Sequence, residues 1–231
     1  MVIGGLAVKT IPGGAFSVIL KPKDYVTVPW KNGAGTTSQI AIFPNTTQST
    51  LATESSFHWR LSSAVLTQPT PFSNFPGCDR ILTLIEGEEL TLHNQTQKKV
   101  TALKRGEIAR FPGEDQIEGG CRNPVTDLGL IFSRAHVTAD CQTMAFSGKP
   151  RSLSFSGTVA VLFSMDGDFR LTVGPKERKF QLRSGETFLY ETRDHRECLV
   201  FIEPLVPRPI HVLVIEISSI ASAPTPATSS I

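Results

Sequence analysis

The sequence predicts an all-β protein made of two similar antiparallel barrels, and three observations support this prediction. Helical periodicity is scarce, whereas short runs of Val, Ile, Thr, Leu and Phe recur along the 231 residues. Sixteen prolines and 18 glycines interrupt these runs, as is typical of chains with many turns. One pattern of strands and glycines also occurs twice, which indicates an internal duplication.

The expected strands are short and apolar, and turn residues separate them at the spacing of a sandwich or barrel. In the first half we expect strands at Tyr25–Pro29, Thr37–Phe43, Phe57–Leu66, Arg80–Glu86, Glu89–His93, Ile108–Phe111 and Leu128–Ser133. In the second half we expect them at Gly157–Phe163, Phe169–Val173, Phe180–Leu182, Thr187–Tyr190, Cys198–Glu203 and Ile210–Ile217.

The duplication is clearest at four glycines. Gly87 and Gly167 follow apolar strands and lie 80 residues apart, whereas Gly106 and Gly185 each precede a glutamate and lie 79 residues apart. Hairpin turns need residues that tolerate positive φ, which explains glycine at these places. The rhythm of strand, glycine, strand, Leu-x-x-Gly-Glu and strand resembles the small β-barrel of the cupins. Two copies of this double-stranded β-helix would make a bicupin.

This repeat divides the chain into four regions. We expect a flexible N-terminus over residues 1–16, a first cupin barrel with a pocket over 17–145, and a second cupin barrel over 146–217. Residues 218–231 contain only Ser, Thr, Ala, Pro and Ile, which predicts a disordered tail. An edge strand such as Ile210–Ile217 could pair with a second copy, so a homodimer is possible.

The composition excludes several classes of protein. Hydrophobic residues make up 40% and charged residues 19%, an ordinary globular balance. A net charge of +2 without basic runs argues against nucleic-acid binding, and no apolar run approaches membrane-spanning length. Glycines and prolines interrupt Met1–Phe16, which argues against a secretory signal. Four cysteines without a CxxC pair then indicate reduced thiols and a cytoplasmic protein.

The segment Trp30–Thr37 is unusually dense in Asn and Gly. Asn32, Gly33 and Gly35 predict a tight turn whose backbone amides lie close together, and Thr36 adds a hydroxyl group. Such a turn can receive an anion or a carboxylate. The alternative is a plain hairpin turn between the two flanking strands.

The strand Phe57–Leu66 carries an arginine among small residues. Because strand side chains alternate between faces, one face holds His58, Arg60, Ser62, Ala64 and Leu66. The small neighbours leave room beside the guanidinium, which suits bidentate recognition of a carboxylate. In the alternative interpretation this face meets solvent, or Arg60 pairs with an internal aspartate.

The loop before the next strand combines aromatic residues with prolines. Phe72, Ser73 and Phe75 lie in this stiff segment, which suits a pocket wall, and Asp79 and Arg80 follow at the strand entry. The alternative is a packed loop with a structural Asp79–Arg80 pair. Further on, Asp127 precedes the strand Leu128–Ser133, which Arg134 follows.

The sequence offers no recognisable metal or nucleophile motif. The five histidines are widely spaced, whereas a transition-metal site needs three or four ligands at fixed geometry. There is no GxSxG elbow and no phosphate-binding glycine pattern. We therefore expect no metal, no cofactor and no assigned catalytic residue.

Taken together, four segments in order resemble the HutD/Ves family of bicupins. They are Trp30-x-Asn32-Gly33-x-Gly35-x-Thr37, Trp59-Arg60-Leu-Ser62-x-Ala64, Phe72-Ser73-x-Phe75-Pro76-Gly77-x-Asp79-Arg80, and Pro124-Val-x-Asp127-Leu128 with the later Arg134. The second half matches through the barrel rhythm alone. The family usually has glycine where Ala34 and Thr70 stand, an aliphatic residue at Cys78 and asparagine at Gly129, and the last change removes a polar group.

The resemblance implies a metal-free bicupin associated in bacteria with histidine utilisation. Family members are proposed to bind a small acidic metabolite, such as urocanate or N-formylglutamate, and to moderate flux. No catalytic activity is firmly assigned to the family.

With this resemblance, we predict that the listed segments border one pocket in the first barrel. Arg60 and Arg80 would hold a small carboxylate. The backbone of Gly33 and Gly35 and the side chains of Asn32, Thr36, Ser62 and Ser73 would orient it, while Trp30, Phe72 and Phe75 would line the pocket. Asp79 and Asp127 would hold the arginines, with Arg134 as a further supporting residue.

Two other functions stay open. One is an enzyme, either an isomerase, epimerase or hydrolase without a metal, or a metallo-cupin with atypical ligands. Its candidate proton-transfer group would be His58, on the predicted face of Arg60. The other is a protein-interaction or storage-like barrel without a small ligand. Bound metal would favour the metallo-enzyme, and stabilisation of a metal-free protein by a ligand would favour the binding protein. Neither result would favour the interaction barrel.

Overall fold

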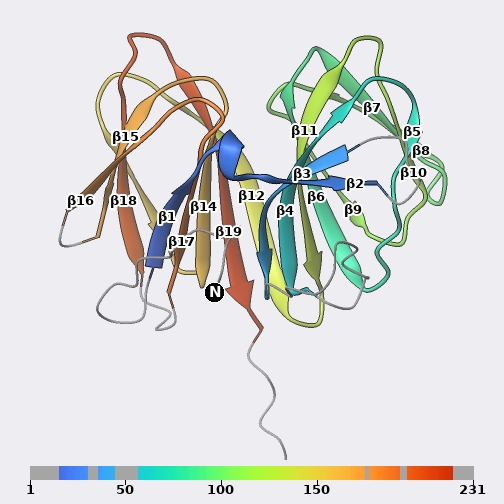
Figure 1. Cartoon of the computed structure of the whole chain (residues 1–231), viewed down its shortest axis with the longest axis horizontal. Helices are drawn as coiled ribbons and strands as arrows, with labels where there is room; N and C mark the ends of the chain where they lie inside the picture. Colours follow the sequence, from blue (N-terminus) through green and yellow to red (C-terminus); the bar gives the residue numbers. More distant parts are fainter. Residues whose placement is uncertain (1–15, 31–35, 45–56, 175–176, 193–196, 221–231) are drawn as a thin grey trace, which may run out of the picture.

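The computed structural model describes residues 16–30, 36–44, 57–174, 177–192 and 197–220. These residues form two antiparallel β-barrels side by side, with one short 3-10 helix, η1 (Pro22–Asp24), between them (Figure 1). The all-β prediction is confirmed. Residues 1–15 and 221–231, expected to be flexible or disordered, lie outside the described residues. The helix found in the described ranges is too short and too polar to cross a membrane.

The first barrel consists of a six-stranded sheet facing a four-stranded sheet. The six-stranded sheet has the order β2 (Val26–Pro29), β3 (Thr36–Phe43), β4 (Trp59–Leu66), β11 (Val125–Ser133), β6 (Cys78–Glu86), β9 (Ile108–Pro112). The four-stranded sheet has the order β5 (Thr70–Pro71), β10 (Ile117–Gly120), β7 (Glu89–Asn94), β8 (Lys99–Lys104).

The second barrel repeats this plan with a five-stranded and a four-stranded sheet. The five-stranded sheet has the order β1 (Phe16–Leu20), β17 (Thr187–Glu191), β14 (Val159–Ser164), β19 (Ile210–Ser219), β12 (Val137–Phe146). The four-stranded sheet has the order β13 (Arg151–Phe155), β18 (Cys198–Pro204), β15 (Phe169–Val173), β16 (Arg178–Leu182). The shared pairing confirms the duplication, because β6, β9 and β11 correspond to β14, β17 and β19.

Each expected strand is present, with ends shifted by a few residues. One shift matters for the site: β4 begins at Trp59, so Phe57 and His58 precede the strand. The strands β1, β5, β8, β10, β12 and β13 were not predicted. Most of them bury few side chains, as in β8, where Leu103 is buried and its neighbours are not, so the apolar signal is weak. The strand β1 is the exception, because its sequence is apolar.

The pairing differs from the predicted division of the chain at two strands. All but one end residue of β1 and of β12 falls within residues 17–145, the predicted first barrel, but both strands pair with the sheet of the second barrel, β1 with β17 and β12 with β19. At the other end, Ser218 and Ser219 were expected to begin the disordered tail but instead extend β19. A neighbouring strand supplies hydrogen bonds that a polar composition does not reveal.

The segment between β1 and β2 crosses from the second barrel to the first (Figure 1). The Tyr25 hydroxyl, just after η1, donates to the carbonyl oxygen of Gly185 at 2.8 Å and lies 3.0 Å from Thr187 Oγ1. Burial raises the pKa of Tyr25 to about 12, so the phenol keeps its proton. This anchor fixes the chain immediately before β2, which becomes an edge strand of the first barrel.

The barrels are joined by a shared apolar core. Side chains on the outer faces of β4, β6 and β11 pack against those of β12, β14 and β19, with Trp59 and Leu213 among the buried residues. Separate clusters fill the interior of each barrel. Burial of this kind stabilises by about 25 cal/mol per Å² of apolar surface removed from water.

Candidate functional site

A pocket opens into the first barrel between β2 and β3, the loop around β5, and the inner face of β4, β11 and β6. Its cavity volume is about 130 Å³. The lining residues are Val28, Pro29, Trp30, Thr37, Gln39, Arg60, Ser62, Ala64, Leu66, Pro71, Phe72, Ser73, Phe75, Arg80, Asp127, Gly129 and Ile131. A predominantly apolar lining with a few convergent polar and charged groups is typical of small-molecule sites.

Strand register places the two pocket arginines in one row of the sheet. Ile131 of β11 is paired with Arg60 of β4 on one side and with Arg80 of β6 on the other. All three side chains point into the barrel, because each lines the pocket. The row therefore presents two cations on either side of an apolar residue.

Arg60 is held by aromatic rings. Its guanidinium carbon lies 5.5 Å from the ring centroid of Phe57 and 5.1 Å from that of Phe75, within the range of cation–π contacts. Among the described residues, its Nε is buried and has no hydrogen-bond partner. Burial lowers the pKa of Arg60, but the guanidinium remains charged. A buried cation with an unused donor is costly unless a ligand pairs with it.

Arg80 is also packed against aromatic rings. Its guanidinium carbon lies 5.0, 5.7 and 5.2 Å from the ring centroids of Phe72, Phe75 and Phe111. Its Nη1 donates to the carbonyl oxygen of Ser73 at 3.2 Å. Burial lowers the pKa of Arg80 to about 10, with Asp127 opposing the shift and Arg60 adding to it. Both arginines therefore contribute positive charge to one apolar pocket.

Asp127 supplies a carboxyl group in the same pocket. The residue is 6% exposed and lies on β11, four residues before Ile131. Burial raises the pKa of Asp127 to about 7, although the charge of Arg80 opposes the rise. At neutral pH this group is therefore close to the point where it exchanges its proton.

Polar groups at the rim complete the site. Trp30 Nε1 donates to Thr37 Oγ1 at 2.6 Å, which fixes the indole ring at the end of β2. Ser62 lies in the second row of β4, beside Gly129. The hydroxyl groups of Thr37 and Ser62 and the apolar rings of Trp30 and Phe72 can orient a small ligand.

The predicted site residues fall into three groups. Trp30, Arg60, Ser62, Phe72, Ser73, Phe75, Arg80 and Asp127 line the pocket together. Asn32, Gly33 and Gly35 lie outside the described residues, although β2 and β3 pair up to Pro29 and Thr36 as a hairpin would. Thr36 opens β3 and is exposed, and Thr37, not Thr36, lines the pocket.

Two predicted supporting residues lie elsewhere. Asp79 does not hold Arg60 or Arg80 but forms an ion pair with Arg134 at 2.7 Å, and Arg134 also pairs with Glu114. These side chains are about 40% exposed, because Asp79 and Arg80 are consecutive on β6 and point to opposite faces. The predicted Asp79–Arg80 pair is therefore replaced by an Asp79–Arg134 pair at the surface.

His58 does not share the face of Arg60. It precedes β4, and its ring stacks on that of His136 at a centroid distance of 4.0 Å. Partial burial, with a smaller effect of His136, lowers the pKa of His58. The strand alternation from which its position was inferred begins only at Trp59, so His58 is not a lining residue.

Sequence reasoning missed lining residues that have no chemical signature of their own. Val28 and Pro29 lie on the edge strand β2 and form one wall of the pocket. Gln39, on the neighbouring strand β3, also lines it. Gly129 and Ile131 follow Asp127 with the period of two that strand alternation gives, and this signal was available. No cluster of three metal-ligating side chains occurs in the part of the chain that the structure describes.

Two of the charged pocket residues, Arg80 and Asp127, have apolar counterparts in the second barrel. Strand pairing makes Ala160 the counterpart of Arg80, and Val212 and Val214 the counterparts of Asp127 and Gly129. All three are buried in an apolar cluster with Phe146 and Phe169. The duplicated fold therefore carries its polar pocket in the first barrel, and the interior of the second is packed with side chains.

Two barrels of this topology, one with a polar pocket and one filled, define a bicupin. The family model described as HutD matches residues 22–201, and the chain belongs to this family. A relative described as an uncharacterized 21.2 kDa protein in the hutC 3′ region of Pseudomonas putida is 31% identical over 163 residues, covering 69% of this chain and 79% of the relative.

Two further comparisons agree with this assignment. A protein named Ves from Escherichia fergusonii is 37% identical over 143 residues, covering 62% of this chain and 69% of the relative. The solved structure of HutD from Pseudomonas fluorescens SBW25 has a TM-score of 0.71 at 22% identity, covering 89% of this chain and all of that chain. At that identity the structural likeness shows the fold.

Proposed function

We propose that this protein binds a small acidic metabolite in the first-barrel pocket without chemically converting it. The observation that carries the proposal is the Arg60 guanidinium, held between Phe57 and Phe75 with its Nε buried and unpartnered. A carboxylate accepts two parallel hydrogen bonds from a guanidinium and would neutralise its charge. Arg80 lies in the same row and adds a second cation.

We further propose a regulatory role in histidine utilisation, with a ligand similar to urocanate or N-formylglutamate. The resemblance of the four motifs to the HutD/Ves family supports this step. The Pseudomonas putida relative, described by its position in the hutC 3′ region, supports it as well. The pocket supports the chemical class of ligand but does not distinguish these two acids.

The experiment is a thermal-shift panel of urocanate, N-formylglutamate, glutamate, histidine and simple mono- and dicarboxylates, each with and without EDTA. A ligand at about 100 times its Kd stabilises the native state by about 2.7 kcal/mol. In a chain of this size that raises Tm by about 5–11 °C. We expect one acid to raise Tm regardless of EDTA.

Two variants make the panel specific. Arg60→Ala should abolish the shift, whereas Arg151→Ala should preserve it. Arg151 is a matched control because it also lies over a phenylalanine ring, 5.4 Å from the Phe146 centroid, but outside the pocket. A shift that survives Arg60→Ala would contradict the proposal. A flat panel would favour a protein-interaction barrel, and a flat panel with Tm lowered by EDTA would favour a metal-dependent enzyme.

One observation favours the enzyme as a second candidate. Burial raises the pKa of Asp127 to about 7, which suits a general acid or base at neutral pH, and its side chain lines the pocket. An isomerase, epimerase or hydrolase acting on a small carboxylate could use this group. Proton NMR of each stabilising acid incubated with the protein in D₂O would detect turnover or isotope exchange, and Asp127→Asn should abolish either.

A further inference from the structure

Besides its two arginines, the pocket contains the carboxyl group of Asp127, which makes no side-chain hydrogen bond among the described residues. We propose that the ligand carries an N–H or O–H donor that binds Asp127, in addition to the acid that binds Arg60 and Arg80. This inference rests on the proposed function and narrows its ligand class. It makes the Asp127 side chain a determinant of specificity.

The sheet register separates the two kinds of contact. Along β11 the pocket-facing positions are Ile131, Gly129 and Asp127, and Arg60 and Arg80 flank the first of them. Two residues along a strand span about 6.7 Å, so the backbone row of the arginines lies about 13 Å from that of Asp127. The long arginine side chains shorten this gap. A ligand of a few bonds can therefore meet the cations with one end and Asp127 with the other.

Among the described residues, Asp127 makes no side-chain hydrogen bond. Its main-chain oxygen accepts a hydrogen bond from Ser63 Oγ at 2.9 Å. The residue is 6% exposed, lines the pocket, and Arg80 is the charged group that acts on its carboxyl. A largely buried carboxyl that faces a pocket gains a hydrogen-bond partner when the ligand carries a donor.

Gly129 provides the space for such a ligand. A Cβ built at this glycine would lie 3.8 Å from Asp127 Oδ1, so no side chain covers the carboxyl from that side. At Gly129 the floor between the arginine row and Asp127 is therefore backbone, with Ser62 beside it on β4. A flat or extended ligand can lie over it and reach both ends.

Charge balance also favours an acid with a donor over a simple acid. The site holds two guanidiniums and one carboxyl group. A ligand with one carboxylate and one N–H or O–H pairs with both signs of charge. A second carboxylate near Asp127 would instead bring like charges together.

The test uses two probe acids that differ in one donor. These are 3-(pyrrol-2-yl)propanoate and 3-(furan-2-yl)propanoate, which share size and charge but carry a ring N–H and a ring oxygen respectively. Isothermal titration calorimetry should give at least about tenfold tighter binding of the pyrrole acid, because a hydrogen bond to a charged group is worth that much. In Asp127→Leu the two acids should bind with about equal affinity. Asp140→Asn, at an exposed carboxylate, should preserve the preference for the pyrrole acid.

The outcomes separate this inference from the proposed function. If both acids bind the native protein equally and Arg60→Ala abolishes both, the acid site stands and the donor inference is overturned. A preference that persists in Asp127→Leu also overturns it. Binding of neither acid at millimolar concentration overturns it for ligands of this size. If Asp127→Leu does not fold, Asp127→Asn should still reduce the preference several-fold.

Discussion

Asp127 is the side chain whose ionisation should most affect the stability of the unliganded protein. Burial raises its pKa from 3.8 to about 7. Between these two values the native state holds a proton that the unfolded chain has released. The free energy of unfolding therefore falls as pH rises from about 4 to about 7, and the loss is complete above that range.

We predict that the native protein loses up to about 4 kcal/mol through this one group, because each pKa unit corresponds to 1.36 kcal/mol. Urea denaturation at pH 5 and pH 8 should show about 2.7 kcal/mol of this loss in the native chain, because about two of the pKa units lie above pH 5. It should be absent in Asp127→Asn, which should be the more stable protein at pH 8. Asp140→Asn controls for removal of a carboxylate at an exposed position. Equal pH dependence in the native chain and Asp127→Asn would contradict the prediction.

At the residue scale, strand alternation correctly predicted which side chains share a face within a strand. Arg60 and Ser62 were placed together on one face, and both line the pocket. The same rule failed at His58, because the strand begins one residue later. Asp79 was misassigned because consecutive strand residues point to opposite faces, so Asp79 meets Arg134. Pairing between distant charges depends on the fold, which local spacing does not contain.

At the scale of elements, the turn between β6 and β7 depends on Gly87. Its φ is +102°, and an added Cβ would lie 2.7 Å from Val125 Cγ1 and 3.1 Å from Val125 Cα. Gly77 also has a positive φ, +79°, but an added Cβ there meets nothing within 4 Å. A side chain at Gly77 would therefore cost backbone strain alone, whereas one at Gly87 would cost backbone strain and steric overlap.

We predict that Gly77→Ala destabilises by about 1–2 kcal/mol, the usual cost of a side chain in the left-handed region. Gly87→Ala should cost at least about 1–3 kcal/mol more, because the clash involves the backbone of β11 as well as a side chain. Equilibrium urea unfolding of the two variants measures the difference. Equal destabilisation would show that the turn relaxes and that Val125 does not constrain it.

The repeated glycines also show how far the element pattern could be interpreted from sequence. Gly87, Gly106 and Gly185 have positive φ, as the turn argument predicts. Gly167 does not, and it is required instead because an added Cβ would lie 2.3 Å from Ile210 Cγ2. The period therefore identified the duplication correctly, while the reason for one glycine was close packing. Strands such as β8 and β12 escaped prediction because hydrogen bonding, more than an apolar face, defines them.

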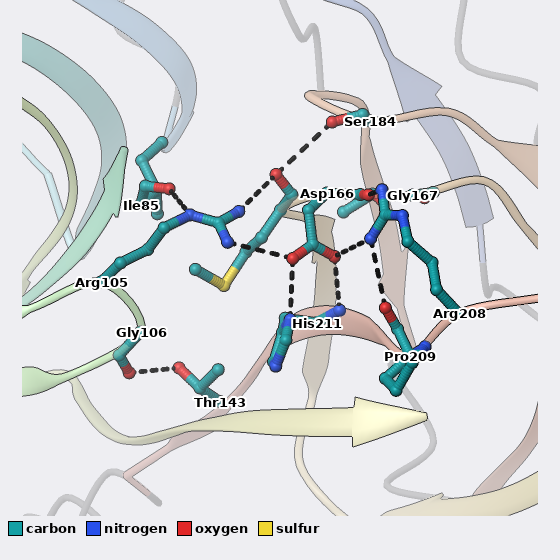
Figure 2. A network of polar contacts seen from close by, with 12 residues as sticks. Ile85, Arg105, Gly106, Thr143, Asp166, Gly167, Ser184, Arg208, Pro209 and His211 are labelled. Carbon is teal, nitrogen blue, oxygen red and sulfur yellow. Dashed lines mark hydrogen bonds and ion pairs between the residues drawn. The ribbon is translucent and has the colours of Figure 1, made fainter. Parts of the chain in front are cut away.

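At the scale of the whole molecule, one polar network connects the barrels next to their shared core (Figure 2). Arg105, in the β8–β9 turn of the first barrel, donates to the carbonyl oxygens of Ile85 and Met165 at 2.9 and 3.1 Å. It also pairs with Asp166 of the second barrel at 3.0 Å. Asp166 in turn accepts a bond from the His211 backbone and lies 2.7 Å from His211 Nδ1. The arginine thus bonds to both barrels at once.

This network should stabilise the docked barrels and should weaken in acid. Hydrogen bonds from His211 and Arg105 outweigh the effect of burial and lower the pKa of Asp166. Its contribution is therefore present above the unfolded value of about 3.8 and lost as pH falls through the native value. We predict that Arg105→Ala costs about 1–3 kcal/mol at pH 7 and less in acid below the native pKa of Asp166, because the two carbonyl bonds persist when Asp166 is protonated.

Arg170→Ala is the matched control, since the Arg170–Glu203 pair is exposed, lies within the second barrel and should contribute at most about 1 kcal/mol. Differential scanning calorimetry and urea unfolding would measure both variants. Because Trp59 and Leu213 belong to one core, the native chain should unfold in a single transition. Arg105→Ala should lower Tm without splitting that transition. Two separate transitions in the native chain, or equal effects of the two arginine variants, would show that the barrels are stable independently of their contact.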